Sequence, residues 1–408
     1  MNVLFLSIGR IENIEENGIY SDLLRYFRNA GHNVYVVTPR ERRLKKHTEY
    51  VTENGIQFLR VKIGNITKTN IIEKGISTLR IEKLFLKAIK KYLNNIKFDL
   101  VIYTTPPITF EKVIAYIKKR DNAKTYLLLK DIFPQNAVDL KMFSKKSLIY
   151  KYFRRKEKKL YAQSDFIGCM SQANVNFILK NNEEVSHEKV EVCPNSIEPL
   201  SIIKNKSEIK EIREKYNIPV DRTVFIYGGN LGKPQGIDFL IECLKANKEN
   251  NQVYFVIAGS GTEFNKIKSF FDRVKLTNAK LFAQLPKDEY EALANSCDVG
   301  LIFLDYRFTI PNFPSRLLSY MQASMPVLAA TDKSTDIGKV IEKGEFGLWC
   351  ESNNVEEFNK KLQILCNPDI RRKMGTNARK YLEENYTVKH TYEIIMKHFK
   401  NEKGKAHV

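Results

Sequence analysis

The stretch 225-FIYGGNLGKPQG-236 sets an apolar run directly before a glycine-rich turn and the start of a helix. Its glycines let the backbone approach a ligand closely, because glycine carries no Cβ. The helix that follows offers free backbone N–H groups to an anion, and Lys233 adds a positive charge. Taken alone, the stretch suits either a phosphate-binding turn or a simple tight connection.

Two further stretches of the second half repeat this arrangement. Residues 256–261 (VIAGSG) are a second apolar run that ends in a Gly-Ser-Gly turn. In 311-PNFPSRLLSYMQASMP-326, Ser315 is expected to begin a helix, so that Arg316 lies in the first turn and can bind a phosphate with two of its guanidinium nitrogens. Because all three turns follow expected strands, we predict that they meet at one edge of one sheet and bind a nucleotide diphosphate.

Short apolar runs alternate with helix-length segments along the whole chain, which predicts parallel sheets covered by helices on both faces. The polar stretch 198–215 is the expected linker between two halves. The predicted fold class is therefore α/β, with two doubly wound domains. The expected strands are residues 2–7, 33–38, 100–104, 125–129, 166–170 and 190–193, then 223–227, 253–258, 281–283, 299–302 and 327–330.

Length and composition agree with two globular domains. The chain has 408 residues, of which 43% are hydrophobic and 28% charged, and this composition excludes a largely disordered protein. Its apolar runs are far shorter than the roughly 20 residues that span a bilayer. The first residues, MNVLFLSIGR, lack the basic segment of a signal peptide and predict a strand, so we expect a cytoplasmic protein.

The net charge of +20 is concentrated in the first half. Residues 1–200 carry 35 Lys+Arg and 21 Asp+Glu, a net charge of +14, whereas residues 201–408 carry 32 and 26, a net charge of +6. Nucleic acid, an anionic membrane, or a lysine-rich genome without functional meaning would each account for this excess.

Several common chemistries find no motif in the sequence. The six cysteines form no C-x-x-C pair, which argues against a zinc site and a disulfide framework. The chain has no G-x-x-x-x-G-K-[ST] stretch and no G-x-G-x-x-G after its first expected strand. An NTPase and a dinucleotide-dependent dehydrogenase are therefore disfavoured.

Taken together, these stretches resemble the GT-B glycosyltransferases of glycosyltransferase family 4, in particular the bacterial enzymes of capsule and O-antigen synthesis. The resemblance covers nearly the whole chain. Besides the three stretches of the second half, it rests on the loop at Gly18, 127-LLLKDIFPQNAVDL-140, 192-VCPNSIEPL-200 and 344-GEFGLWCE-351.

The resemblance implies two Rossmann-like domains that face each other across a cleft. Residues 1–198 would bind the acceptor and residues 199–385 the nucleotide-sugar, while 386–408 would form a helix that crosses back to the first domain, and a tail. It further implies retention of anomeric configuration and no metal cofactor. The chain has no Asp-x-Asp, which agrees with diphosphate binding by amides and cations.

Residue by residue, the resemblance assigns Lys233 and Arg316 to the donor diphosphate, with further hydrogen bonds from Ser315 and the amide of Leu317. The family's Glu-x7-Glu motif is absent, and Ser319 stands at its second position. Backbone around residues 284–286 would recognise the base, uracil or guanine. The full donor-binding set is Gly18, Gly229, Asn230, Lys233, Gln235, Gly259, Gly261, Leu285, Ser315, Arg316, Leu317 and Ser319.

Asp131 is the candidate catalytic residue of the first half. It follows the expected strand 125–129 and precedes Pro134, so it should lie at the carboxyl end of a strand. Its carboxylate would take the proton of the acceptor hydroxyl or only position that hydroxyl, since the departing phosphate can itself accept the proton. The alternative is an Asp that caps the next helical turn.

Residues 141–161, KMFSKKSLIYKYFRRKEKKLY, combine aromatic residues with a dense basic run. A basic helix with aromatic edges suits anionic lipid head groups. We expect peripheral membrane docking by the first domain through this helix, supported by residues 79–92; the alternative is an ordinary solvated helix face. The candidate lipid-binding residues are Arg154, Arg155, Lys158 and Lys159.

The leading hypothesis is a retaining glycosyltransferase that moves a sugar, such as an N-acetylated hexosamine, from a UDP-sugar to a polyprenyl-diphosphate-linked saccharide. No cofactor is expected, and the partners are the two substrates and the membrane rather than nucleic acid. One alternative is a nucleotide-sugar epimerase of the same fold. Another is a basic nucleic-acid-binding protein, although no helix or aromatic sheet face suited to reading nucleic acid is evident.

Overall fold

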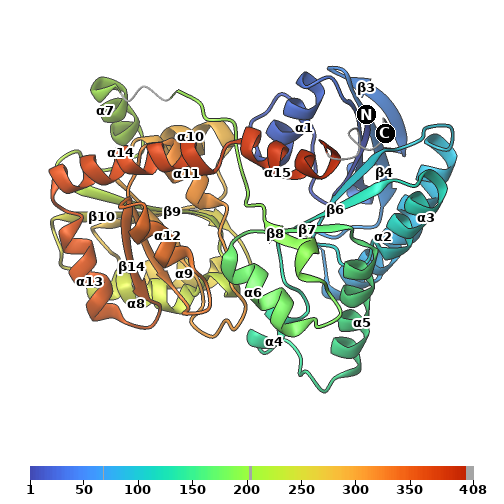
Figure 1. The fold of residues 1–408 in the computed structure, drawn as a ribbon. Coiled ribbons are helices and arrows are strands. Elements are labelled where there is room, and N and C mark those ends of the chain that lie inside the picture. The colour runs from blue at the N-terminus through green and yellow to red at the C-terminus, as the bar shows by residue number, and fades with distance from the viewer. Residues whose placement is uncertain (68, 202–204, 401–408) are drawn as a thin grey trace. The chain divides into compact units, whose positions relative to one another are not determined.

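A computed structural model describes residues 1–67, 69–201 and 205–400 of the chain (Figure 1). Residues 202–204 of the predicted linker and the predicted tail after Lys400 lie outside this part. The chain forms two compact units: Met1–Glu198 with the segment that begins at Thr387, and Pro199–Tyr386. Each unit contains a sheet of mainly parallel strands with helices, so the predicted α/β class with two doubly wound domains is confirmed.

Within the described residues, the first unit has an eight-stranded sheet in the order β3-β4-β2-β1-β5-β6-β7-β8. β3 pairs antiparallel with β4, and the other neighbours run parallel. The strands are β1 (Asn2–Leu6), β2 (Asn33–Glu41), β3 (Glu49–Glu53), β4 (Ile56–Ile63), β5 (Leu100–Thr104), β6 (Lys124–Leu129), β7 (Phe166–Cys169) and β8 (Val190–Val192). The helices are α1 (Ile19–Asn29), α2 (Ile71–Tyr92), α3 (Glu111–Asp121), α4 (Gln135–Asp139), α5 (Leu148–Gln163), α6 (Gln172–Asn181) and α15 (Val388–Lys400).

In the described part of the second unit, a six-stranded parallel sheet has the order β11-β10-β9-β12-β13-β14. Its strands are β9 (Thr223–Asn230), β10 (Val253–Ser260), β11 (Ala279–Phe282), β12 (Val299–Phe303), β13 (Val327–Thr331) and β14 (Gly347–Glu351). The helices are α7 (Lys206–Lys215), α8 (Ile237–Ala246), α9 (Phe264–Val274), α10 (Lys287–Asn295), α11 (Arg316–Gln322), α12 (Ile337–Lys343), α13 (Val355–Ile364) and α14 (Pro368–Asn385).

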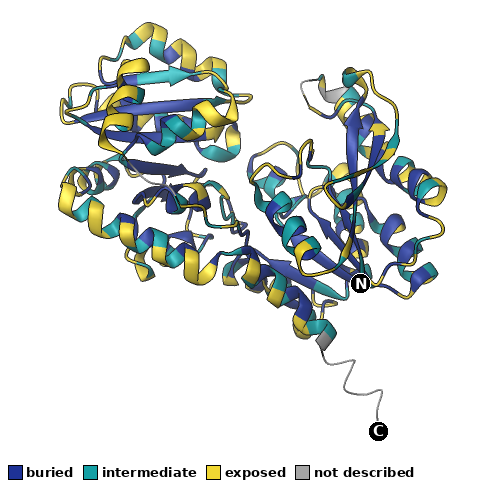
Figure 2. Cartoon of the chain, turned by 90° about the horizontal axis from the view of Figure 1, so that it is seen from above, coloured by how far each residue is buried: buried dark blue, intermediate teal, exposed yellow. Residues whose placement is uncertain are grey.

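The central strands are buried on both faces, which explains their almost continuous apolar sequences (Figure 2). All five residues of β5, LVIYT, are buried, as are all five of β12, VGLIF. Helices α1, α8 and α9 each place an apolar face on this core. The six cysteines are free thiols, and five of them are buried core residues.

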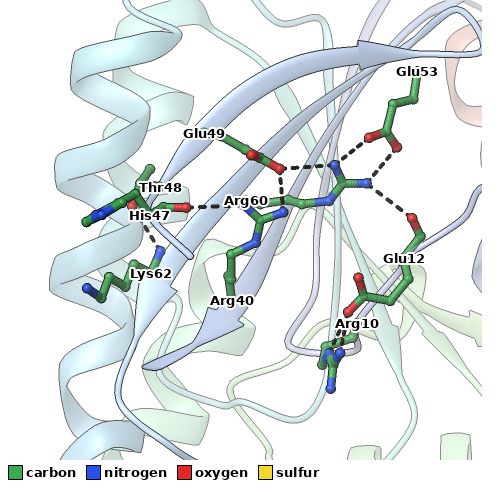
Figure 3. Close-up of polar contacts among 9 residues, drawn as sticks. All are labelled: Arg10, Glu12, Arg40, His47, Thr48, Glu49, Glu53, Arg60 and Lys62. Atoms are coloured by element: carbon green, nitrogen blue, oxygen red, sulfur yellow. Dashed lines mark hydrogen bonds and ion pairs between the residues drawn. The ribbon is translucent and has the colours of Figure 1, made fainter. Parts of the chain in front are cut away.

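The β3–β4 hairpin, which is absent from the strands expected from sequence, extends the sheet of the first unit. Its turn is Asn54-Gly55, with φ of 47° and 76°, the positive pair that a two-residue type I′ turn requires. Arg60 of β4 is buried and pairs with Glu53 of β3 at 2.6 Å. Arg40 of β2 pairs with Glu49 in the same network (Figure 3). These ion pairs connect the edge strand β3 to its neighbours in the sheet and stabilise its position.

Helix α15 packs on the first unit after the chain returns to it. The backbone N–H of Val388 donates to the carbonyl oxygen of Ile197 at 3.2 Å. Farther along the helix, the ring of Tyr392 lies 4.9 Å from that of Phe27, and its hydroxyl contacts His32 at 2.9 Å. The last helix therefore completes the core of the unit in which the chain began.

Candidate active site

Strands β9 and β10 end side by side in the two predicted glycine-rich turns. They pair in parallel register, with Gly229 opposite Gly259. Gly229 has a φ of 122°, a conformation that L side chains rarely adopt. A Cβ on Gly259 would lie 1.8 Å from the carbonyl oxygen of Gly229, and one on Gly261 would lie 2.3 Å from that of Leu231. The backbones approach this closely only because these residues are glycine.

The third predicted stretch brings Arg316 to the same edge of the sheet. Its guanidinium carbon lies 4.2 Å from the ring centre of Tyr227, a residue of β9. A Cβ built on Gly229 would lie 3.4 Å from Nη2 of Arg316. The other terminal nitrogen, Nη1, is buried and has no hydrogen-bond partner among the described residues. A buried donor without an acceptor costs about 1–3 kcal/mol, so an anion bound here would supply the missing partner.

Three tyrosines that sequence reasoning missed contact or adjoin Arg316: Tyr227, Tyr290 and Tyr320. The hydroxyl of Tyr320 donates to a main-chain carbonyl of β9 at 3.2 Å. A Cβ on Gly228 would lie 1.8 Å from the hydroxyl oxygen of Tyr290, so this hydroxyl covers the strand end. Burial raises the pKa of Tyr290 to about 12, which keeps its phenol neutral at physiological pH. The three come from separate elements, and no sequence spacing connects them.

The turn after β9 is ordered by its own side chains. The side-chain oxygen of Gln235 accepts hydrogen bonds from Nδ2 of Asn230 at 2.8 Å and from the backbone N–H of Gly232 at 3.2 Å. Asn230 and Gln235, both predicted donor ligands, therefore hold the turn in shape. Lys233 in the same turn is exposed and forms no ion pair within the described part of the chain. Its ammonium is available to an anion.

Segment 284–286 lies next to the turn that ends β10. The hydroxyl of Ser260 contacts the side-chain oxygen of Gln284 at 3.4 Å. The predicted base-contacting residue Leu285 follows directly and is half-buried. The structure thus brings this loop to the edge of the sheet where the glycine turns end.

The start of α11 contains further residues of the predicted donor-binding set. Ser315 and Ser319 are both exposed and remain available to a ligand. The amide of Leu317, however, donates to the carbonyl oxygen of Pro314 at 3.2 Å. This i→i+3 hydrogen bond closes the first turn of the helix, and the contact of the Leu317 amide with the diphosphate stays a prediction.

Asp131 lies just past the carboxyl end of β6, as predicted, in the first unit. Its carboxylate accepts a hydrogen bond from Nδ2 of Asn136 in α4 at 2.8 Å, and its amide donates to the hydroxyl of Thr105 at 3.2 Å. Burial raises the pKa of the Asp131 carboxyl to about 6. The contact with α4 fits the capping alternative, whereas the raised pKa suits proton transfer near neutral pH.

Gly18 also belongs to the first unit, directly before α1. Its backbone is extended, with a φ of 169°, and its N–H donates to the buried carboxylate of Asp22 at 2.9 Å. The same carboxylate accepts the backbone N–H of Glu198 at 2.9 Å. The structure thus brings Gly229, Gly259 and Arg316 together within the second unit. Gly18 and Asp131 belong to the first unit.

Helix α5 divides its predicted lipid-binding residues into two groups. Arg154 pairs with the buried carboxylate of Glu157 at 2.6 Å, so its guanidinium neutralises an internal charge. Lys158 pairs with an exposed glutamate at 3.1 Å. Arg155 and Lys159 are exposed, and neither forms an ion pair in the described residues.

Among the described residues, no helix combines the length and hydropathy needed to cross a bilayer. No three or more His, Cys, Asp or Glu side chains are grouped there as metal ligands would be.

Each unit matches a known family model. Residues 20–199 match "Glycosyltransferase Family 4", and residues 208–381 match "Glycosyl transferases group 1". "Probable glycosyltransferase WbjE" of Pseudomonas aeruginosa is 25% identical over 335 residues, which cover 80% of both chains. "Uncharacterized glycosyltransferase MJ1069" of Methanocaldococcus jannaschii is 22% identical over 377 residues, 91% of this chain and 90% of the relative.

Solved structures show the same fold at low identity. Anabaena HepE in complex with UDP superimposes with a TM-score of 0.69 at 16% identity, covering 98% of this chain and 100% of that one. The lipopolysaccharide glycosyltransferase WaaG gives a TM-score of 0.63 at 14% identity, covering 96% of this chain and 99% of that one.

The arrangement of the two Rossmann-like units along the chain is that of the GT-B glycosyltransferases. Since one family model matches the first unit and the other the second, the chain belongs to the GT-B enzymes of glycosyltransferase family 4. The resemblance predicted from sequence is thereby confirmed.

Proposed function

We propose that this glycosyltransferase moves a hexose or N-acetylhexosamine residue from a UDP-sugar to a polyprenyl-diphosphate-linked saccharide, during synthesis of a surface polysaccharide. The observation that carries the proposal is the buried Nη1 of Arg316, which lacks an acceptor beside the glycine-ended strands β9 and β10. Two kinds of relative support it. HepE was crystallised with UDP and with UDP-glucose, and a relative in Escherichia coli, 21% identical over 136 residues, is named for colanic acid biosynthesis.

The donor diphosphate would lie at the edge formed by the β9 and β10 turns. Arg316 and Lys233 would neutralise its charge, since both cations lack an ionic partner within the described residues. The glycines at 229, 259 and 261 let the ends of β9 and β10 and the guanidinium of Arg316 pack closely at this edge. Such a site stabilises the departing nucleoside diphosphate with fixed charges and amides, and we propose that it needs no divalent cation.

In the proposed transfer, the bond between the anomeric carbon and the β-phosphate oxygen breaks. The acceptor hydroxyl oxygen forms the new bond on the same face of the sugar, which retains the configuration. The hydroxyl proton passes to the departing phosphate oxygen or to Asp131, and in either case Asp131 would orient the hydroxyl. Its pKa of about 6 leaves the carboxylate mostly ionised at pH 7 and able to accept that hydrogen bond.

We further propose that the enzyme docks peripherally on the inner face of the cell membrane through the start of α5. Three apolar side chains are exposed there, Leu148 by 82%, Ile149 by 55% and Tyr152 by 46%, and Met142, before the helix, is 64% exposed. The unpaired cations Arg155 and Lys159 follow on the same helix. Exposed apolar residues next to cations suit the boundary between acyl chains and anionic head groups.

The donor site is tested by thermal unfolding with UDP, GDP and a panel of nucleotide sugars. A ligand at a hundredfold excess over its Kd should stabilise the chain by about 2.7 kcal/mol. Arg316→Ala should abolish this stabilisation. Arg372→Ala, which removes an exposed arginine of the same unit, should preserve it. Equal stabilisation of both variants would remove Arg316 from the donor site.

A further inference from the structure

The first unit contains a cavity of about 690 Å³ that none of the site residues above line. It lies between the short 3-10 helix η1 (Arg42–Leu44), the end of β4 and the N-terminal half of α2. Because β2 and β4 are parallel neighbours that both run toward it, the cavity opens at the carboxyl edge of the sheet. Its volume falls within the range of ligand-binding pockets.

One face of α2 forms a wall of this cavity. Glu73, Ile76, Arg80 and Leu84 line it, and their spacing of three or four residues places them on one side of the helix. The helix begins at a capped end, where the side chain of Asn70 accepts the backbone N–H of Glu73 at 2.8 Å. The wall is therefore part of a regular helix.

The charge of the cavity is positive. Arg42, Lys62 and Arg80 line it against the single carboxylate of Glu73. That carboxylate already binds Arg42 at 2.8 Å and a neighbouring threonine hydroxyl at 2.5 Å. Lys62 and Arg80 form no ion pair within the described part of the chain. Two cations thus converge on the cavity without a counter-charge.

Lys62 differs from the neighbouring Arg60 of β4 in having no carboxylate partner in the part of the chain that the structure describes. Arg60, two residues earlier on the same face of the strand, is bound by the carboxylates of β3 (Figure 3). Lys62 is drawn in the same view without a link to those carboxylates, and the contact drawn for it joins its backbone N–H to Thr48. The carboxylates of the hairpin pair with the buried arginines, whereas the exposed Lys62 has no ion pair among the described residues.

An apolar strip adjoins the cations. Ile76 lines the cavity and is 54% exposed, and Leu79, one turn along α2, is 50% exposed. The lining also includes Ile63 and Leu84. A simple inorganic anion would leave these side chains in water. A ligand with a phosphate at one end and hydrocarbon next to it would cover both features.

We infer that this cavity binds an aliphatic diphosphate. The phosphates would contact Arg42, Lys62 and Arg80, and the chain would lie along Ile76 and Leu79. The inference rests on the proposed function, because a diphosphate on an isoprenoid chain is the lipid end of the proposed acceptor. It assigns a binding site for that end within the first unit, apart from the donor residues of the second.

The test measures direct binding of farnesyl diphosphate, inorganic pyrophosphate and farnesol to the full chain by calorimetry. Farnesyl diphosphate should bind at least tenfold more tightly than either of the other two. The double variant Lys62→Ala/Arg80→Ala should weaken its binding at least tenfold. The matched control Lys83→Ala/Lys87→Ala removes two exposed cations of α2 that do not line the cavity, and it should change the Kd less than twofold.

A third variant separates the apolar contribution. Ile76→Ser should weaken farnesyl diphosphate severalfold and leave pyrophosphate unchanged. The inference would be overturned if Lys62→Ala/Arg80→Ala and the control Lys83→Ala/Lys87→Ala lost the same affinity for farnesyl diphosphate. It would also be overturned if pyrophosphate bound as tightly as farnesyl diphosphate. Far-ultraviolet circular dichroism and thermal unfolding like those of the unaltered chain would show that each variant folds.

The same variants distinguish failure of this inference from failure of the proposed function. Transfer to a lipid-linked acceptor with an unchanged KM in Lys62→Ala/Arg80→Ala would refute the cavity and keep the function. If binding of farnesyl diphosphate required Lys62 and Arg80 but the chain transferred no sugar from any nucleotide sugar, the inferred binding site would be supported and the proposed function refuted.

Discussion

Gly259 shows how one residue fixes the geometry of the donor site. A methyl group there would lie 1.8 Å from the carbonyl oxygen of Gly229, so the neighbouring strand would have to move. We expect Gly259→Ala to destabilise the second unit by about 3 kcal/mol and to abolish stabilisation by UDP. The same substitution at Gly75 meets no atom within 4 Å and lies inside α2, where alanine should stabilise by about 0.5–1 kcal/mol. Urea unfolding of the two variants measures both effects, and a fully stable Gly259→Ala would contradict the close approach.

The buried carboxylate of Asp131 is expected to lower the stability of the folded chain at high pH while it supports activity. Burial raises its pKa from 3.8 to about 6, so the folded chain binds this proton more tightly than the unfolded chain does. The stability contributed by the proton is fully present below pH 3.8 and is lost as the pH rises through about 6. Asp131→Asn should therefore raise the melting temperature at pH 8 more than at pH 4, because a neutral amide replaces a buried carboxylate.

The activity of the same variant should fall. The amide cannot accept the proton of the acceptor hydroxyl, and we expect kcat to drop at least tenfold while stabilisation by UDP is retained. The wild-type kcat should decline below about pH 6, where the carboxylate becomes protonated. A wild-type rate that stays constant from pH 5 to 8 would contradict a role for the ionised carboxylate.

At the scale of elements, the sequence predicts most of the parallel strands but misses the β3–β4 hairpin and β14. Long apolar runs such as β5 and β12 are visible because both faces are buried. β3 is half-exposed and polar, and it was missed even though Asn54-Gly55 is a strong hairpin signal. β14, at the edge of the other sheet, was also absent from the expected strands.

The sequence also does not show which way an individual side chain points. Composition indicates that α5 is basic, but only the fold shows that Arg154 serves the buried Glu157. The three glycine turns could be predicted to meet because parallel strands share a carboxyl edge. The tyrosines around Arg316 could not, because their proximity depends on how β9, α10 and α11 pack together.

The exposed start of α5 yields a prediction at the element scale. Leu148→Ser combined with Ile149→Ser removes apolar side chains that are 82% and 55% exposed, so the fold should be unaffected. Binding to vesicles that contain phosphatidylglycerol should weaken at least tenfold in a sedimentation assay. Val220→Ser/Ile364→Ser, exposed positions of the second unit, should leave vesicle binding unchanged. Retained binding in the first variant would place the membrane contact elsewhere.

At the scale of the whole molecule, the chain leaves its first unit at Glu198 and returns to it at Thr387. Each unit has its own sheet and its own buried core, so each can respond separately to a ligand. The chain contains one tryptophan, Trp349, which lies in β14 of the second unit and donates to the hydroxyl of Thr331 at 2.7 Å. Its fluorescence therefore reports on the unit that contains the glycine turns and Arg316.

We predict that UDP shifts the unfolding curve followed by tryptophan fluorescence more than the curve followed by far-ultraviolet circular dichroism, which reports on both units. For a ligand worth about 2.7 kcal/mol at a hundredfold excess, the fluorescence midpoint should rise by roughly 5–10 °C. Arg316→Ala should cancel the shift without moving the curve recorded in the absence of UDP by a comparable amount. Fluorescence and dichroism curves that coincide and move together with UDP would mean that the two units unfold as one cooperative body, contrary to the separate response expected from two independent cores.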